Sequence, residues 1–343
     1  MCREALKLIL LSGGNGKRLW PLSSEILPKQ FVKIMQDDDS EPQSMIQRTW
    51  KILASRFGES NLCIVAGEHQ ASVIREQLRA DVPLILEPFR RDTFAAVALA
   101  SHYLRDVVGL HPDETIVMLP VDAFADESFY DKIEELDQLV RQSFGKLALI
   151  GIRPTFPSEK YGYISAAAIP QTRYMKVDSF YEKPDAATAD ELIRRGALWN
   201  CGVFACRLGY MLDLLAAQNR PASYAEMLDM YDSLPRISFD YMVVEPEKDL
   251  ACVEYEGRWT DLGTWSEMAL MLGQDDSLVV RGDNCEGTYV FNKLNVPIIV
   301  TGIPNAVIVA GPEGILISDN SVSHLIKPLV DRLDSEKEKR ARI

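Results

Sequence analysis

Regular alternation over the first 150 residues is the feature that most limits the folds open to this chain. Short apolar runs occur at residues 7–11, 62–66, 83–86, 115–119 and 147–152. Stretches with helical spacing separate them, at residues 44–57, 69–79, 93–105 and 129–143. Apolar strands that alternate with helices predict a mostly parallel sheet with helices on both faces. In such a sheet, ligands bind at the carboxyl ends of the strands.

The pattern changes twice farther along the chain. After about residue 150 the strand-like runs continue with shorter helices between them, which predicts antiparallel additions to the same sheet. From residue 277 a series of short β runs is broken by Gly, Pro and Asn, which is typical of a small β-rich module. We therefore expect one large domain at residues 1–276 and a C-terminal module at residues 277–343.

Composition excludes several classes of protein. The formal net charge of −13 argues against a nucleic-acid-binding surface, where a basic face is expected. The chain has no apolar run near the ~18 residues of a membrane span, and its N-terminus does not resemble a signal peptide. The six cysteines are scattered, which indicates reduced thiols in a cytoplasmic protein and not a thiolate metal site.

A glycine-rich loop follows the first predicted strand. The segment LSGGNGKRLWPLSSEILPKQ covers residues 11–30. It is not a P-loop, because Gly16 and Lys17 are followed by Arg18, where that motif needs a hydroxyl residue. It is not a dinucleotide-binding fingerprint, because Leu19 stands where the third glycine is required.

The loop nevertheless has the properties of a polyphosphate site. Its glycines allow the backbone to approach a ligand closely and to point N–H groups toward it. Its cations, Lys17, Arg18 and Lys29, concentrate positive charge in an acidic protein. The alternative is an ordinary solvated turn between a strand and a helix. The position of the loop after the first parallel strand favours the ligand site.

Glu87 follows the third predicted strand, in the segment LILEPFRRDTFAA. A carboxylate can accept hydrogen bonds from the two adjacent donors of guanine, N1–H and the exocyclic amine. Adenine and cytosine present different edges. The alternative role for Glu87 is a helix cap or a salt bridge.

The loop resembles the N-terminal motif of sugar-phosphate nucleotidylyltransferases, and specifically of mannose-1-phosphate guanylyltransferases. Further segments that resemble motifs of this family lie at residues 84–96, 117–125, 158–166, 177–185, 198–206, 238–245 and 257–268. The chain departs from the family pattern at Asp92, Ala123, Lys160 and Cys201, where the family usually has Asn, His, Gly and Ser.

The resemblance implies roles for individual residues. The expected nucleotide-binding residues are Leu11, Ser12, Gly13, Gly14, Gly16, Lys17, Glu87, Arg91, Asp92 and Thr93. The expected sugar-phosphate-binding residues are Gly162, Glu182, Lys183 and Asn200. The expected catalytic cations are Arg18, Lys29 and Lys183. Asp122, at the end of the fourth strand, and Asp261, in GRWTDLGTW, are the expected ligands of Mg²⁺, which prefers carboxylates together with phosphate oxygens. The alternative for both acids is a turn or helix cap.

The resemblance also implies the fold and the reaction. We expect a Rossmann-like α/β domain of the nucleotide-diphospho-sugar transferase type, and a C-terminal module that is part of a left-handed β-helix and helps to form a homodimer. The expected reaction is transfer of a guanylyl group from GTP to mannose 1-phosphate with Mg²⁺, without nucleic-acid or membrane partners. One alternative is an enzyme for another base and sugar, such as UTP, dTTP or CTP with glucose or heptose 1-phosphate. The other is a regulatory homologue that binds the nucleotide sugar without turnover.

Overall fold

The chain folds into two compact units. The computed structural model describes residues 6–14, 19–24, 27–36, 41–218, 221–272 and 278–341. The first unit comprises Met1–Gly13, Thr49–Val121 and Ala125–Trp259. The second comprises Gly14–Arg48, Asp122–Phe124 and Thr260–Ile343. The predicted domain boundary between residues 276 and 277 lies outside the described residues.

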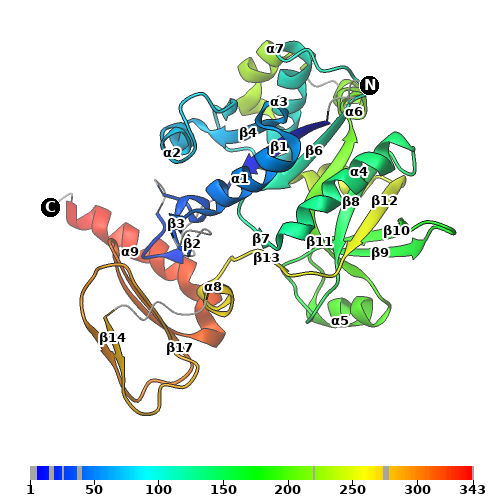
Figure 1. Cartoon of the computed structure of the whole chain (residues 1–343). Helices are drawn as coiled ribbons and strands as arrows, with labels where there is room; N and C mark the ends of the chain where they lie inside the picture. The colour runs from blue at the N-terminus through cyan, green and yellow to red at the C-terminus, as the bar shows by residue number, and fades with distance from the viewer. Residues whose placement is uncertain are drawn as a thin grey trace. The chain divides into compact units, whose positions relative to one another are not determined.

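A mixed sheet forms the centre of the first unit (Figure 1). Its described strands are β1 (Leu6–Ser12), β4 (Leu62–Gly67), β5 (Leu84–Glu87), β6 (Thr115–Pro120), β8 (Leu147–Ile152), β9 (Tyr163–Ala168), β10 (Met175–Tyr181), β11 (Leu198–Arg207) and β12 (Leu250–Tyr255). They lie in the order β5-β4-β1-β6-β11-β8-β12-β10-β9. Strands β10 and β11 pair antiparallel with their neighbours, and the pairs β4–β5, β1–β4, β1–β6 and β8–β12 are parallel. The predicted mostly parallel sheet with antiparallel additions is therefore confirmed.

Helices cover both faces of this sheet. The described helices of this region are α1 (Met45–Phe57), α2 (Ala71–Gln77), α3 (Asp92–Asp106), α4 (Lys132–Arg141), α5 (Ala186–Arg194), α6 (Leu208–Ala217) and α7 (Tyr224–Asp229). Helix α3 packs with α6 and α7 over one set of alternate strand residues, which includes Ile9 and Met118. Helix α4 contacts β6, β8, β11 and β12, and its buried residues lie outside that cluster. All residues of β8 are buried, as expected for a strand covered on both sides.

Short helical turns complete the first unit. They are η3 (Glu59–Asn61), η4 (Glu68–Gln70), η5 (Glu127–Asp131), η6 (Tyr231–Ser233) and the single π-helical turn η7 (Asp240–Val244). Single π turns are frequent at functional sites. In the described part of the chain, no helix combines the length and the apolar character that crossing a membrane requires.

The second unit has its own core. It contains η2 (Lys29–Phe31), β2 (Met35–Gln36), β3 (Pro42–Gln43), α8 (Trp265–Leu272), β14 (Val279–Arg281), β15 (Tyr289–Asn292), β16 (Ile298–Val300), β17 (Ala306–Gly311), β18 (Gly314–Asp319), η8 (Asn320–Leu325) and α9 (Ile326–Ala341). Two further short strands, β7 (Phe124–Ala125) and β13 (Trp259–Thr260), span the positions where the chain passes between units.

The fully buried Trp265 lies in the core of the second unit with Phe291, Val307 and Ile326. Its indole N–H donates a 2.9 Å hydrogen bond to the carbonyl of Trp20, which ties the segment after the glycine-rich loop to this core. Strands β14 and β16 pair parallel, as do β15 and β17, which is the pairing that a β-helix requires. The expected β strands toward the C-terminus are therefore present, and their organisation as a separate module and as part of a left-handed β-helix stays a prediction.

Candidate active site

The glycine-rich loop follows directly after β1. Leu11 and Ser12 are the last residues of β1, and the Ser12 hydroxyl lies 3.5 Å from Oε1 of the buried Gln70. Among the described residues, an added Cβ would meet nothing within 4 Å at Gly13 or at Gly14, and Gly14 has a φ of +114° that only glycine adopts readily. Both glycines therefore leave room for a ligand against the backbone. The predicted Gly16, Lys17 and Arg18 lie outside the described residues.

Glu87 ends β5, at the same edge of the sheet as the end of β1. Its Oε1 accepts a hydrogen bond from the hydroxyl of the fully buried Tyr231. Burial raises the pKa of Glu87, and the Tyr231 hydrogen bond and the nearby Arg90 oppose that rise in pKa. The carboxylate is thus held at one oxygen by a buried phenol, at the place where a base is expected.

The other three residues of the predicted base loop lie at the start of α3. Arg91 forms an ion pair with Asp232. Asp92 has a φ of +67°, and its Oδ1 accepts the backbone N–H of Thr93 at 2.7 Å. The Thr93 hydroxyl oxygen accepts the backbone N–H of Phe239 at 2.8 Å. The Asp92 side chain thus bonds the backbone of the next residue, at the first position of α3.

The predicted sugar residues meet at the ends of β9, β10 and β11. The carbonyl of Gly162 accepts the backbone N–H of Asn200 at 2.8 Å. A Cβ on Gly162 would lie only 2.6 Å from Oε2 of Glu182 and 3.3 Å from Cβ of Asn200. The Glu182 side chain is 5% exposed, and its Oε2 is buried with no hydrogen-bond partner among the described residues. A buried acceptor without a donor is unfavourable unless a ligand supplies one.

Lys183 and Asp240 border the same cluster. The Lys183 ammonium pairs with Oε1 of Glu182 at 2.5 Å, and Lys183 itself has a φ of +48°. Asp240 begins η7, and its Oδ1 accepts a 2.6 Å hydrogen bond from Nδ2 of Asn200. Burial raises the pKa of Asp240. Non-glycine residues at positive φ and buried carboxylates both occur preferentially at functional sites.

Residues 239 and 240 join the two predicted sets within the first unit. The backbone N–H of Phe239 contacts Thr93 of the nucleotide set, and the carboxylate of Asp240 contacts Asn200 of the sugar set. The structure therefore brings these predicted residues to one region at the carboxyl ends of the parallel strands.

In the second unit, Lys29 lies between the two predicted metal ligands. Its Nζ is 2.9 Å from Oδ2 of Asp122 and 3.2 Å from Oδ1 of Asp261, and it also donates to the Asp261 carbonyl at 2.8 Å. Burial alone would lower the pKa of Lys29, but the two carboxylates outweigh burial and raise it. The three residues, which are far apart in sequence, thus form one charged cluster.

The two carboxylates of this cluster are ligands of the kind that Mg²⁺ takes. Among the described residues there is no group of three or more His, Cys, Asp or Glu that could hold a metal. Zinc sites usually need three or four such ligands. Mg²⁺ is held by one or two carboxylates together with substrate phosphates and water. Two carboxylates close enough to share one ammonium satisfy that requirement.

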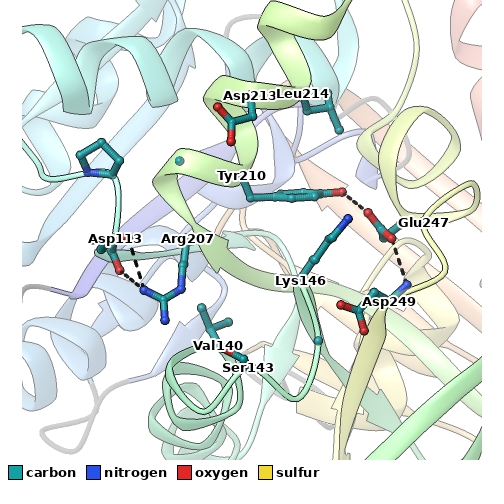
Figure 2. Close-up of a pocket in the computed structure, with 13 residues that line it drawn as sticks. Asp113, Val140, Ser143, Lys146, Arg207, Tyr210, Asp213, Leu214, Glu247 and Asp249 are labelled. Atoms are coloured by element: carbon teal, nitrogen blue, oxygen red, sulfur yellow. Dashed lines mark hydrogen bonds and ion pairs between the residues drawn. The ribbon is translucent and has the colours of Figure 1, made fainter.

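A separate cavity of about 700 Å³ lies at the amino ends of the parallel strands (Figure 2). None of the predicted site residues lines it. Its polar groups largely bind one another: Tyr210 donates to Glu247 at 2.9 Å, and Arg207 donates to the Asp113 carbonyl at 3.2 Å. This cavity is therefore at the edge of the sheet opposite to the candidate site.

Sequence reasoning missed two residues of the site. Asp240 lies in the segment SFDYMVVE, which belongs to the resemblance, but no role is predicted for it. No sequence motif marks Tyr231, because its hydrogen-bond partner Glu87 is 144 residues away in the chain. A buried tyrosine at such a position is otherwise indistinguishable from a core residue.

Three comparisons relate the chain to known proteins. The family model described as "Nucleotidyl transferase" matches residues 7–272. The xanthan biosynthesis protein XanB of Xanthomonas campestris pv. campestris (strain B100) is 31% identical over 354 residues, covering 95% of this chain and 73% of that protein. A mannose-1-phosphate guanylyltransferase of Escherichia coli is 30% identical over 363 residues, covering 95% of this chain and 75% of that protein.

A solved structure has the same fold over nearly the whole chain. It is described as a mannose-1-phosphate geranyltransferase from Thermus thermophilus, and it superposes with a TM-score of 0.82 at 26% identity. The match covers 96% of this chain and 99% of that chain. A family model that spans most of the chain, relatives that cover it almost completely and a shared fold lead to one conclusion: the chain belongs to the nucleotidyl transferase family.

Proposed function

We propose that this protein transfers a guanylyl group from GTP to mannose 1-phosphate, giving GDP-mannose and pyrophosphate. The similarity to relatives that are named mannose-1-phosphate guanylyltransferases supports this proposal over nearly the full chain. The observation that carries it is the buried Glu182 Oε2, which lacks a donor among the described residues beside Gly162 and Asn200. A sugar hydroxyl is the donor that this oxygen needs.

The sugar is recognised by a small set of polar groups. Glu182 accepts from one hydroxyl, and Asn200, already oriented by Asp240, presents an amide near a second. Gly162 is required because any side chain there would fill the space next to Glu182. Lys183, half-exposed and beside Glu182, supplies the compact positive charge that suits a phosphate on the sugar.

The base is recognised at the end of β5. Glu87 accepts from guanine N1–H and the exocyclic amine, a pair of donors that adenine and the pyrimidines do not present in the same arrangement. Gly13 and Gly14 give the nucleotide access to the backbone after β1. Leu11 and Ser12 fix the start of that loop.

The reaction is a direct displacement at phosphorus. A phosphate oxygen of mannose 1-phosphate attacks the α-phosphorus of GTP, and the bond from the α-phosphorus to the bridging oxygen breaks as pyrophosphate leaves. Lys183 holds the attacking phosphate in line, and Arg18 and Lys29 stabilise negative charge on the α-phosphate and the leaving group. Positioning and charge stabilisation of this kind supply most of the catalysis in phosphoryl-type transfers.

Asp122 and Asp261 would hold Mg²⁺ in this reaction. The bound ion supplies positive charge to the phosphates of the substrate. The clustering of both carboxylates around one lysine ammonium supports this assignment.

The proposal is tested by initial rates of pyrophosphate release. Each of GTP, ATP, UTP, dTTP and CTP is combined in turn with mannose, glucose or heptose 1-phosphate, with and without Mg²⁺. We expect GTP with mannose 1-phosphate to give the highest kcat/KM, and no release without Mg²⁺. A higher kcat/KM for another pair would instead assign the chain to that reaction. Absence of release with every pair would assign it a non-catalytic, nucleotide-sugar-binding role.

We also propose that the protein forms a homodimer through its C-terminal module. Strand β18 lies at the edge of its described sheet and exposes Ile315 and Ile317, which are 60% and 63% exposed. Exposed apolar residues of this kind are typical of association surfaces. Sedimentation of the wild-type chain should give a dimer, and Ile317→Asp should give a monomer. A wild-type monomer would contradict this assignment.

The cysteines support a reducing compartment such as the cytoplasm. The five described cysteines are free, and four of them, Cys63, Cys201, Cys206 and Cys252, are buried. Burial raises the pKa of the Cys63 and Cys201 thiols to about 12, so neither is a reactive thiolate. Reduced, inert thiols are the usual state in the cytoplasm.

A further inference from the structure

The base loop, residues 87–94, is contacted by one segment of the same unit, residues 231–239. Tyr231 donates to Glu87, and Asp232 pairs with Arg91, so two consecutive residues of η6 hold both ends of the Pro88–Arg90 turn. Farther along, the backbone N–H of Phe239 donates to Thr93, and the backbone N–H of Phe94 donates to the carbonyl of Ile237 at 3.3 Å.

Tyr231 is the rigid part of this arrangement. Its side chain is fully buried and packs in the same core cluster as Met227, Leu234 and Phe239. Its hydroxyl has a single proton, and that proton is donated to Oε1 of Glu87. Because the phenol ring is packed in the core, this hydrogen bond holds Oε1 of Glu87 in one place and limits rotation of the carboxylate.

The orientation of the Glu87 carboxylate determines whether it can bind a base that has two adjacent donors. A carboxylate accepts two parallel hydrogen bonds only when its two oxygens face the N1–H and the exocyclic amine together. A freely rotating carboxylate accepts one of them at a time. The packing around Glu87 therefore bears on which base is accepted.

We propose that Tyr231 is the positioning residue that orients the Glu87 carboxylate for selection of the base, and that Asp232 steadies the same loop through Arg91. This inference rests on the proposed function, in which Glu87 reads the base. Tyr231 is buried behind Glu87 and acts only through it.

The test compares GTP with inosine triphosphate, which lacks the exocyclic amine. In the wild type, kcat/KM should favour GTP because both donors are satisfied. Tyr231→Phe removes only the hydroxyl, and it should lower the preference for GTP over inosine triphosphate by about tenfold, the size expected for a hydrogen bond to a charged group. The change should arise mainly from KM for GTP, with kcat at saturation near that of the wild type.

The chain offers a matched control for this variant. Tyr210 also donates its hydroxyl to a glutamate, Glu247, but at the opposite edge of the sheet (Figure 2). Tyr210→Phe should leave the preference for GTP unchanged. If Tyr210→Phe lowered the preference as much as Tyr231→Phe, a general loss of stability would explain both and the inference would be overturned.

Glu87→Gln separates this inference from the function on which it rests. If Glu87→Gln leaves the preference unchanged, Glu87 does not read the base, and the proposed base contact fails with the inference. If Glu87→Gln abolishes the preference and Tyr231→Phe, correctly folded by circular dichroism, leaves it intact, only the inference fails. Combining the two substitutions should give no further loss beyond Glu87→Gln, because both act on one contact.

Asp232→Asn tests the part of the inference that concerns Arg91, whether or not Tyr231→Phe folds. Asp232 is exposed, so this variant should fold normally. Release of Arg91 should raise KM for GTP and inosine triphosphate alike by about threefold, in line with an exposed ion pair. Unchanged KM values for both nucleotides would overturn the role assigned to this segment.

Discussion

The ammonium of Lys29 lies 2.9 Å from Oδ2 of Asp122, within the second unit. The same ammonium is 3.2 Å from Oδ1 of Asp261, although Lys29 and Asp261 are 232 residues apart in the chain. One cation thus holds two carboxylates together, and the three side chains form a single charged unit.

Lys29→Ala should lower kcat/KM by about 10²–10³, the loss typical for removing one preorganised group that stabilises developing charge. Steady-state pyrophosphate release with GTP and mannose 1-phosphate measures this. Lys176→Ala is the matched control, because Lys176 also pairs with an aspartate, Asp249, but away from the candidate site. Near-normal turnover of Lys29→Ala with intact folding would remove Lys29 from the catalytic set.

Lys183→Gly should abolish most activity without lowering stability. Lys183 has a φ of +48°, a conformation that glycine adopts without strain, so the substitution relieves the backbone while removing the ammonium. We expect kcat/KM to fall by about 10²–10³, because the attacking phosphate of mannose 1-phosphate is no longer held by Lys183. The midpoint of thermal unfolding should stay the same or rise. A large drop in that midpoint would indicate that Lys183 is mainly structural.

Gly162→Ala should impair binding of the sugar phosphate selectively. The new Cβ would lie 2.6 Å from Glu182 Oε2 and 3.0 Å from the Phe180 ring, so Glu182 has to move. KM for mannose 1-phosphate should rise by about tenfold or more. A displaced Glu182 loses its hydrogen bond to the sugar, and a hydrogen bond to a charged group has about that effect. KM for GTP should change little. Equal effects on both substrates would argue against a sugar site at Gly162.

Asp240→Asn should make the protein more stable. Burial raises the pKa of Asp240, so the ionised carboxylate disfavours the folded state at neutral pH. The neighbouring side chains that bear on this charge include Lys183, Asp92, Glu182 and Asn200. Asn200 donates a hydrogen bond to it at 2.6 Å. The amide removes the unfavourable charge and should raise the unfolding midpoint by about 2–4 °C for each kcal/mol gained.

The pH dependence of this effect has a definite sign. A carboxyl group whose folded pKa is raised lowers stability above that pKa, and it has no such effect below its ordinary, unfolded pKa. The advantage of Asp240→Asn should therefore be largest at neutral and alkaline pH and should disappear as the pH falls through this window. Thermal unfolding of both proteins from about pH 4 to about pH 8 measures this. An advantage that grows toward acid pH would contradict the buried-charge explanation.

Much of the fold could be predicted from the sequence. The strands around Ile9, Ile64 and Val117 form near-continuous apolar runs because they are buried on both faces, and this signal is strong. The position of the glycine-rich loop could be predicted because the end of a parallel strand is a general ligand position.

The contacts within the site were harder to predict. The pairing of Glu87 with Tyr231 and of Asn200 with Asp240 depends on how distant segments pack, and neither residue type nor spacing encodes it. The predicted proximity of Asp122 and Asp261 came only from resemblance to a family. No periodicity in the chain connects a residue after β6 with one after β13.

The most direct test of the central claim is a single competition reaction. The purified protein is incubated with Mg²⁺, equal concentrations of GTP, ATP, UTP, dTTP and CTP, and equal concentrations of mannose 1-phosphate and glucose 1-phosphate, and the nucleotide sugars formed are identified by mass spectrometry. We predict that GDP-mannose is the dominant product and that pyrophosphate is released in equal amount. A different dominant nucleotide sugar, or no nucleotide sugar at all, would contradict the proposed function.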